Sequence, residues 1–404
     1  MRFSENTIYI PHILLPVNAA DPAFMRAWSV IACDQFTSDR GYWDELDRET
    51  GGAPSTLRLI LPEAYLQDAD AAEKIAAADE NMERYLAAGI FRRLPRGFVL
   101  TERTFPNGAV RRGLLLAVDL ENYSFTPGEQ AAVRATEATV PERLPPRMAV
   151  RRGAKLELPH VILLYDAPEA DILPAPAAEG APEGKALYDF ELNRGGGHLR
   201  GWFLSEESAR EIRSRLYASA KDGFLFAVGD GNHSLAAAKR CWEEKKGAMS
   251  AAERENHPAR YALCEAVSVR SPAVVFHPIH RIVTGVDAAG FLSALQRACP
   301  FPVLGEGRIA SFSAGTDVAA AIAFTDKFIS SYTAERGGGV DYIHGGRELE
   351  GLVSAAADRA GVRFEPVGKA DFFRGAAANG VFPRKTFSVG EGYEKRYYTE
   401  CKEI

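Results

Sequence analysis

The chain of 404 residues lacks any apolar run long enough to cross a bilayer. The longest runs, such as residues 113–118, are far shorter than the roughly 20 residues that a spanning helix needs. The first residues are too polar for a secretory signal. No internal repeat or low-complexity tract stands out. These absences predict a soluble globular protein in the cytoplasm.

Cysteine is also scarce, and the chain has no net positive charge. The five cysteines are scattered, odd in number and without a Cys-x-x-Cys pair, which argues against a disulfide framework or a zinc ribbon. A formal net charge of -6 provides no basic field for nucleic acid or an anionic membrane, and no helix-turn-helix segment is recognisable. We therefore expect small-molecule partners, with no nucleic acid and no membrane.

The hydrophobic fraction of 46% is ordinary for a globular chain large enough for two or three domains. Helical and β-type segments are mixed along it, so the expected fold class is α/β, with mixed α+β sheets. Asn107-Gly108 supplies a positive φ for a turn between strands at 98–101 and 111–119. Composition changes near residue 125, and we expect domains at 1–125, 126–289 and 290–404.

Periodicity places the remaining elements. Helices are predicted over residues 68–88, 206–220, 235–246, 287–299 and 348–360, and strands over 160–165 and 224–228. Residues 173–184 are rich in Pro, Ala and Gly, which predicts an exposed loop. Glycines 195–197 predict a second flexible turn that is able to approach a ligand.

The segment with the most functional content joins the predicted strand 224–228 to the predicted helix 235–246. It reads Gly229-Asp230-Gly231-Asn232-His233-Ser234. Its glycines let the backbone approach a ligand, and its donors precede the positive end of a helix, which favours an anion such as phosphate. Asp230 is an acceptor for a hydroxyl substrate or for magnesium. The alternative is a plain strand-to-helix connection with Ser234 as N-cap.

Residues 229–239 resemble the signature segment of the family called domain of unknown function 1015. Residues 32–38, 134–139, 195–201, 278–281 and 383–387 agree with the same family, so the resemblance spans nearly the whole chain. In many members the loop has the sequence Asp-Gly-His-His-Arg, which is similar to the phosphate motif of the ParB and sulfiredoxin-like fold. The resemblance implies such a core at 126–289, with additional N- and C-terminal α+β regions.

That fold includes nucleotide-dependent enzymes, among them free serine kinase, in which a glutamate serves the substrate hydroxyl. By this resemblance Glu137 is the candidate general base, and Asp230 and His233 are the other catalytic candidates. The resemblance also implies Mg2+, held at Asp230, and a nucleotide, ATP or ADP. From the residues alone, an exposed glutamate on a polar loop is the simpler interpretation of Glu137.

This sequence departs from the common loop at two positions, where Asn232 replaces a histidine and Ser234 an arginine. A lost guanidinium removes a bidentate phosphate contact, so catalysis requires positive charge from elsewhere. The candidates for binding phosphate or nucleotide are Gly229, Gly231, Asn232, Ser234, His198, Arg200, His280, Arg281 and Lys385. For Arg281 an ordinary ion pair is the alternative, and for His198 a loop end. Zinc at His277 and His280 is disfavoured because Pro278 opposes a helix.

The leading hypothesis is a nucleotide-dependent phosphotransferase acting on a small hydroxylated metabolite, with a serine-like amino acid as the example that the resemblance implies. A nucleotide-binding sensor or assembly protein without turnover is the alternative, and a phosphoester hydrolase is a third. Sulfiredoxin-type reduction is discounted because position 232 is not a cysteine. Cys33 is equally a buried small hydrophobe or a reactive thiol. The oligomeric state, including a homo-oligomer, stays open.

Overall fold

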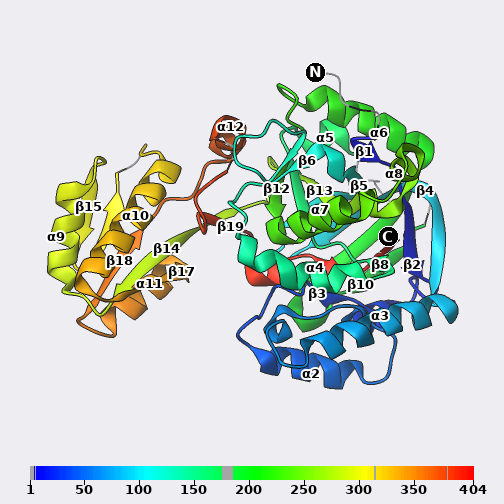
Figure 1. Cartoon of the computed structure of the whole chain (residues 1–404), viewed down its shortest axis with the longest axis horizontal. Helices are drawn as coiled ribbons and strands as arrows, with labels where there is room; N and C mark the ends of the chain where they lie inside the picture. Colours follow the sequence, from blue (N-terminus) through cyan, green and yellow to red (C-terminus); the bar gives the residue numbers. More distant parts are fainter. Residues whose placement is uncertain (1–3, 5, 175–184, 314, 380) are drawn as a thin grey trace. The chain divides into compact units, whose positions relative to one another are not determined.

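The computed structural model describes residues 4, 6–174, 185–313, 315–379 and 381–404 (Figure 1). These residues form two compact units. Unit 2 is Val275–Glu391, and unit 1 contains the described residues on both sides of it in the sequence. This division differs from the three domains expected from the sequence, because residue 125 lies within unit 1 and the chain returns to unit 1 at Gly392.

Unit 1 contains an 11-stranded mixed sheet in the described residues, with the order β10-β11-β4-β5-β13-β9-β12-β7-β6 and with β1 and β2 paired to β5 and β4. Its strands are β1 (Ile8–Tyr9), β2 (His12–Pro16), β4 (Phe91–Thr104), β5 (Val110–Asp119), β6 (Tyr123–Ser124), β7 (Val133–Arg134), β9 (Ile162–Tyr165), β10 (Tyr188–Glu191), β11 (His198–Ser205), β12 (Phe226–Asp230) and β13 (Tyr261–Ser268). Two smaller pairs tie the C-terminal segment to unit 1: β3 (Val30–Ile31) with β20 (Tyr397–Tyr398), and β8 (Leu156–Glu157) with β21 (Lys402–Glu403).

The helices of unit 1 pack on both faces of this sheet (Figure 1). They are α1 (Pro22–Trp28), α2 (Arg40–Thr50), α3 (Ala71–Ala87), α4 (Leu144–Arg152), α5 (Glu169–Ile172), α6 (Glu206–Ser219), α7 (Asn232–Lys246) and α8 (Ala251–Asn256). Short 3-10 turns are η1 (Thr56–Leu59), η2 (Glu63–Tyr65), η3 (Leu120–Asn122), η4 (Pro141–Arg143), η5 (Asn193–Gly195), η6 (Pro258–Arg260) and η7 (Gly392–Glu394). In β5, Leu114 and Leu116 join the core under α6 and α7, whereas Leu115 joins the core under α1, α2 and α3. Burial on both faces explains why this strand is a nearly continuous apolar run.

The described part of unit 2 contains a six-stranded sheet with the order β15-β16-β18-β14-β17, in which β19 pairs with β14. Its strands are β14 (Phe276–Thr284), β15 (Val303–Glu306), β16 (Ile309–Phe312), β17 (Gly339–His344), β18 (Arg359–Arg363) and β19 (Phe387–Val389). Its helices are α9 (Ala288–Ala298), α10 (Val318–Arg336), α11 (Gly346–Ser354) and α12 (Lys369–Asn379). Phe291 of α9, Ile322 of α10 and Val362 of β18 lie in its core.

The mixed α/β class predicted from the sequence is confirmed. The predicted helices 68–88, 206–220 and 287–299 correspond to α3, α6 and α9, and the predicted strands 98–101, 111–119 and 160–165 fall on β4, β5 and β9. The helix predicted over 348–360 is wrong in its last part, where Ala360 and Val362 alternate into the core as part of β18. Most of the loop expected at 173–184 lies outside the described residues. None of the described helices has the length and apolarity needed to cross a membrane.

Two residues predicted to bind nucleotide are buried inside unit 2. The Arg281 side chain has 0% exposure, and its Nε and Nη2 donate to Asp326 at 2.7 and 2.9 Å. Its Nη1 donates to the carbonyls of Ile279 and Lys385 at 2.7 and 2.9 Å. His280 is also buried, and its Nδ1 accepts a hydrogen bond from the main-chain N–H of Phe364 at 3.2 Å. Both side chains therefore have partners within unit 2.

The buried imidazole of His280 makes unit 2 sensitive to acid. Burial, aided by Arg363 and Arg281, lowers the pKa of His280 from 6.5 to about 4. Between these values the unfolded chain binds more protons, so stability falls as the pH drops through this window, by roughly 3 kcal/mol in total. Thermal unfolding followed from about pH 7 to about pH 4 is expected to show a weaker acid dependence in His280→Asn.

The control is His277→Asn, which changes the more exposed histidine of the same strand, β14. An acid dependence that is the same in the wild type and in His280→Asn would contradict the assignment.

Candidate functional site

The connection between β12 and α7 is a single residue, because β12 ends at Asp230 and α7 begins at Asn232. Gly231 has a φ of 78° and is the N-cap residue of α7 in the left-handed region. The helix predicted to start at 235 therefore starts earlier, and the interpretation of Ser234 as its N-cap is wrong. Ser234 lies in the first turn, and its hydroxyl contacts a histidine instead.

Packing against β9 and against Val161, which directly precedes it, explains why both loop positions are glycine. A Cβ on Gly231 would lie 3.0 Å from Cγ2 and 3.1 Å from Cα of Val161. A Cβ on Gly229 would lie 2.8 Å from Cγ of Leu164, at a point where the register between β12 and β9 shifts. The two glycines therefore let the turn lie close against its neighbouring strand.

The segment that contains Glu137 lies against the start of α7. The main-chain N–H of Thr136 donates to Oδ1 of Asn232 at 3.0 Å, and the N–H of Val140 donates to Nε2 of His233 at 3.3 Å. Glu137 stands between these two contacts in the sequence and is half-buried. The structure thus places the segment of Glu137 against Asn232 and His233. The two hydrogen bonds join residues that are 96 and 93 positions apart in the sequence.

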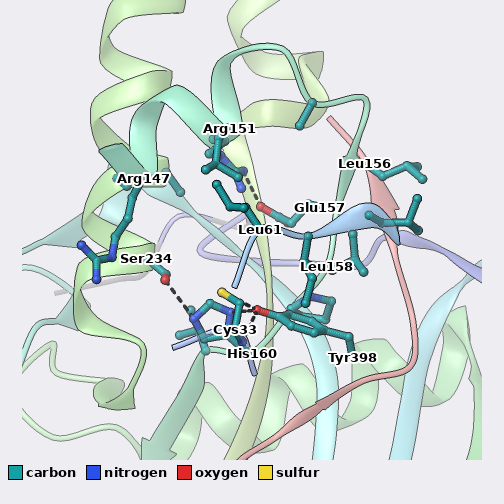
Figure 2. Close-up of a pocket in the computed structure, with 18 of the residues that line it drawn as sticks. Cys33, Leu61, Arg147, Arg151, Leu156, Glu157, Leu158, His160, Ser234 and Tyr398 are labelled. Carbon is teal, nitrogen blue, oxygen red and sulfur yellow. Dashed lines mark hydrogen bonds and ion pairs between the residues drawn. The ribbon is translucent and has the colours of Figure 1, made fainter. Parts of the chain in front are cut away.

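Ser234 begins a series of hydrogen bonds through His160 and Tyr398 to Cys33, here called the polar chain (Figure 2). Ser234 Oγ lies 2.8 Å from Nε2 of His160, and Nδ1 of His160 lies 2.8 Å from the Tyr398 hydroxyl. The Tyr398 hydroxyl donates to Sγ of Cys33 at 3.1 Å. Because that hydroxyl has a single proton, Nδ1 of His160 donates to it, and Nε2 has Ser234 Oγ as its partner.

Two charged groups next to the turn were not singled out from the sequence. Nζ of Lys395 lies 3.2 Å from Oδ2 of Asp230, with side-chain exposures of only 8% and 16%. Burial alone would raise the pKa of Asp34, but His160, Gln35 and Lys395 outweigh it and hold that pKa below its ordinary value. Lys395 is therefore a cation beside the acidic groups Asp230 and Asp34. The sequence marks it only as part of the charged run Glu394-Lys395-Arg396, which the structure buries.

The remaining predicted residues lie elsewhere. Arg200 pairs with Glu102 of β4, and Nε2 of His198 lies 2.8 Å from Asp189 of β10. Gly197 packs so closely that a Cβ there would overlap the carbonyl oxygen of Thr104. His280, Arg281 and Lys385 belong to unit 2.

Cys33 does not have the environment of a reactive thiol. Burial raises the pKa of the Cys33 thiol far above its ordinary value, and Asp34 and Glu63 add to this effect. The thiolate is the nucleophilic form, so a thiol that stays protonated is unreactive. Cys33 is half-buried, and of its two interpretations the reactive thiol is the one that this environment disfavours.

The polar chain lies at one end of a cavity of about 150 Å³ in unit 1 (Figure 2). Most of the lining is apolar, and Glu63 and Arg147 add an ion pair near the polar end. Across the ranges that the structure describes, no group of three or more His, Cys, Asp or Glu side chains is placed to hold a metal ion.

The fold and this turn define a mixed α/β protein with a strand–glycine–helix site. The model of the family described as "Protein of unknown function (DUF1015)" matches residues 14–353, and the chain belongs to this family. The resemblance seen in the sequence is thereby confirmed. No curated protein matches the chain.

Solved structures with similarity to this chain include a variant of free serine kinase in complex with ADP, at 11% identity and a TM-score of 0.38, covering 70% of this chain and 90% of that chain. Free serine kinase in complex with AMP has 12% identity, a TM-score of 0.37 and the same coverage. SbnI with a C-terminal truncation, from Staphylococcus aureus, has 10% identity and a TM-score of 0.36, covering 68% of this chain and 82% of that chain.

The crowding of Gly231 predicts a stability difference between two glycine variants. Gly128 also has a positive φ, of 84°, but nothing lies within 4 Å of the position of its Cβ. Gly128→Ala is expected to cost roughly 1–2 kcal/mol through backbone strain alone. Gly231→Ala is expected to cost a further 1–3 kcal/mol or so, because the backbone of Val161 cannot move aside easily. Denaturant unfolding measures both, and equal losses would contradict this account of the turn.

Proposed function

We propose that the turn at Gly231 binds the phosphates of a nucleotide and that the chain is a nucleotide-dependent phosphotransferase acting on a small hydroxylated metabolite. One observation carries this proposal: the segment of Glu137 is hydrogen-bonded to the first two residues of α7. A carboxylate-bearing segment thus adjoins a helix N-terminus, which is where an anion binds most favourably.

The start of α7 suits a phosphate group. Within the described residues, no side chain accepts a hydrogen bond from the helix as its N-cap, since the N-cap residue is Gly231. A bound phosphate would take that place and lie at the positive end of the helix dipole. Lys395 lies beside Asp230 and would provide the positive charge that the family's more common arginine provides at position 234.

A magnesium ion fits this arrangement as a companion of the nucleotide. Mg2+ prefers oxygen ligands and is usually bound through one or two carboxylates together with substrate phosphates and waters. Asp230 is a half-buried carboxylate directly before the turn, and it would hold such an ion. The ion would offset the negative charge of the phosphates.

In the proposed reaction, Glu137 accepts the proton of the substrate hydroxyl as its oxygen attacks the terminal phosphorus atom of the nucleotide. A new P–O bond forms, and the P–O bond to the leaving nucleotide breaks with its electron pair. Catalysis then depends on positioning and on charge stabilisation, as is usual for phosphoryl transfer.

A non-catalytic nucleotide sensor is the second candidate. The side chains of Asn232 and Ser234, where the family more often has histidine and arginine, are engaged with Thr136 and His160. Such contacts connect the turn to its surroundings without contributing a charge to the phosphate. In this case nucleotide binding would change the position of these neighbours and no group would be transferred.

Phosphorus NMR of the protein with Mg2+, ATP or ADP and a pool of hydroxylated amino acids distinguishes these functions. We expect a new phosphoester signal whose rate of formation falls on the order of 100-fold in Glu137→Gln. Glu142→Gln, an exposed glutamate of η4, is the matched control. Free phosphate alone would indicate a phosphoester hydrolase, and a broadened nucleotide signal without turnover would indicate the sensor.

The charge of Lys395 gives a separate prediction. Lys395→Met is expected to raise the Kd of the nucleotide by about 10-fold, because one charge-assisted contact to phosphate is lost. Lys385→Met, in unit 2, is the matched control that tests the candidate taken from the sequence. Isothermal titration calorimetry measures both, and a larger effect of Lys385→Met would reverse the assignment.

A further inference from the structure

The cavity beside the polar chain has an apolar interior. Its apolar lining lies in and beside η1, η2, α3, α4, α7, β8 and β13, and includes Leu61, Leu66, Met82, Leu158, Ala237 and Leu263. The packed interiors of proteins contain few voids larger than a water molecule. A volume of about 150 Å³ inside unit 1 is therefore space that a ligand is able to fill.

The side walls offer no charge to a ligand. Glu157 is paired with Arg151, and its Oε1 also accepts a hydrogen bond from the main-chain N–H of Leu263 at 2.5 Å. Glu63 is paired with Arg147, and these two charges offset one another. An ionised ligand would lose its hydration in this cavity without gaining an unpaired partner, so a neutral ligand is favoured.

The polar end of the cavity fits one neutral group. Ser234 and His160 both line the cavity, and Ser234 Oγ lies 2.8 Å from His160 Nε2 (Figure 2). The single hydrogen-bonding position of His160 Nε2 is taken by Ser234, so a ligand hydroxyl, which is both a donor and an acceptor, bonds to Oγ of Ser234. Ser234 and Arg147 at this end are half-buried, and so are Leu66 and Leu158 of the apolar lining.

We propose that this cavity is a binding site for a small neutral alcohol or phenol, with its hydroxyl at Ser234 and its apolar body among the leucines. The volume corresponds to an apolar body of about the size of benzene, which binds in apolar cavities of about 150 Å³. Burial of that body removes apolar surface from water and restores contacts that an empty space would lack.

The binding itself requires no phosphoryl transfer. Ser234 also belongs to the first turn of α7, next to the proposed phosphate site. Glu137, the proposed general base, does not line this cavity, so the cavity site stands apart from the proposed phosphoryl transfer.

The test uses the full chain without nucleotide and three probes that share a phenyl ring: benzyl alcohol, toluene and benzoate. Isothermal titration calorimetry is expected to show benzyl alcohol binding about threefold to tenfold more tightly than toluene, since one neutral hydrogen bond is gained. Benzoate is expected to bind more weakly than both, because its charge must be desolvated. Tightest binding of benzoate, or no binding of any probe, would overturn the proposal.

Two variants locate the site. Ala154→Leu adds volume at a half-buried position of the lining and is expected to abolish binding of benzyl alcohol and toluene. Ala220→Leu makes the same change at a half-buried position outside the lining and is expected to leave binding unchanged. Ser234→Ala is expected to reduce benzyl alcohol to the affinity of toluene, which keeps the test decisive if Ala154→Leu fails to fold.

The outcomes separate this site from the proposed function. Binding of benzyl alcohol that Ala154→Leu abolishes, in a protein without phosphoryl transfer, supports the cavity site while the phosphotransferase fails. Phosphoryl transfer to another acceptor, with no binding of the probes, overturns the cavity site and leaves the phosphotransferase standing. Binding that is equal in the wild type and in Ala154→Leu places the probes elsewhere and overturns the proposal.

Discussion

The buried guanidinium of Arg396 holds together the parts of unit 1 that form the candidate site. Its Nε donates to Glu265 of β13 at 2.9 Å, its Nη2 donates to Glu400 at 2.6 Å, and its Nη1 donates to the carbonyls of Pro159 and Tyr397, each at 2.8 Å. Pro159 and Tyr397 directly precede His160 and Tyr398, the two residues of the polar chain that have rings. A charge removed from water needs such a full set of partners, so this one residue fixes where both rings lie.

The centre of the sheet is adapted to that charge. Glu265 lies on β13, and it also accepts a hydrogen bond from the hydroxyl of Thr101 on β4 at 2.9 Å. On the strand between them, β5, Gly113 leaves room for the carboxylate, because a Cβ there would overlap it. The apolar cores on the two faces supply most of the burial, while the charged residues determine which segment lies at this position. The charges thus contribute specificity of arrangement more than stability.

Much of the fold was predictable from local patterns, and much of the site was not. Helices such as α3 and α6 show apolar residues at helical spacing, and the turn at residue 231 follows from its glycines. Helix α10 was missed although Ala321, Thr325 and Ile329 are buried at helical spacing, because its exposed face also contains apolar residues. The partners of the turn lie far along the chain: His160 is 74 positions from Ser234, and Tyr398 is 238 positions from His160. No local pattern records such pairs.

The insertion of unit 2 determines the order in which the site can form. In the sequence, Val275–Glu391 comes after the strands of the unit 1 sheet and before Lys395 and Arg396. A ribosome therefore synthesises all of unit 2 before it adds these two residues. The phosphate turn is made much earlier, and in a growing chain it lacks its neighbouring cation and the guanidinium that positions His160. A prematurely ended chain would therefore carry the recognisable motif of this family without the charges that surround it in the complete fold.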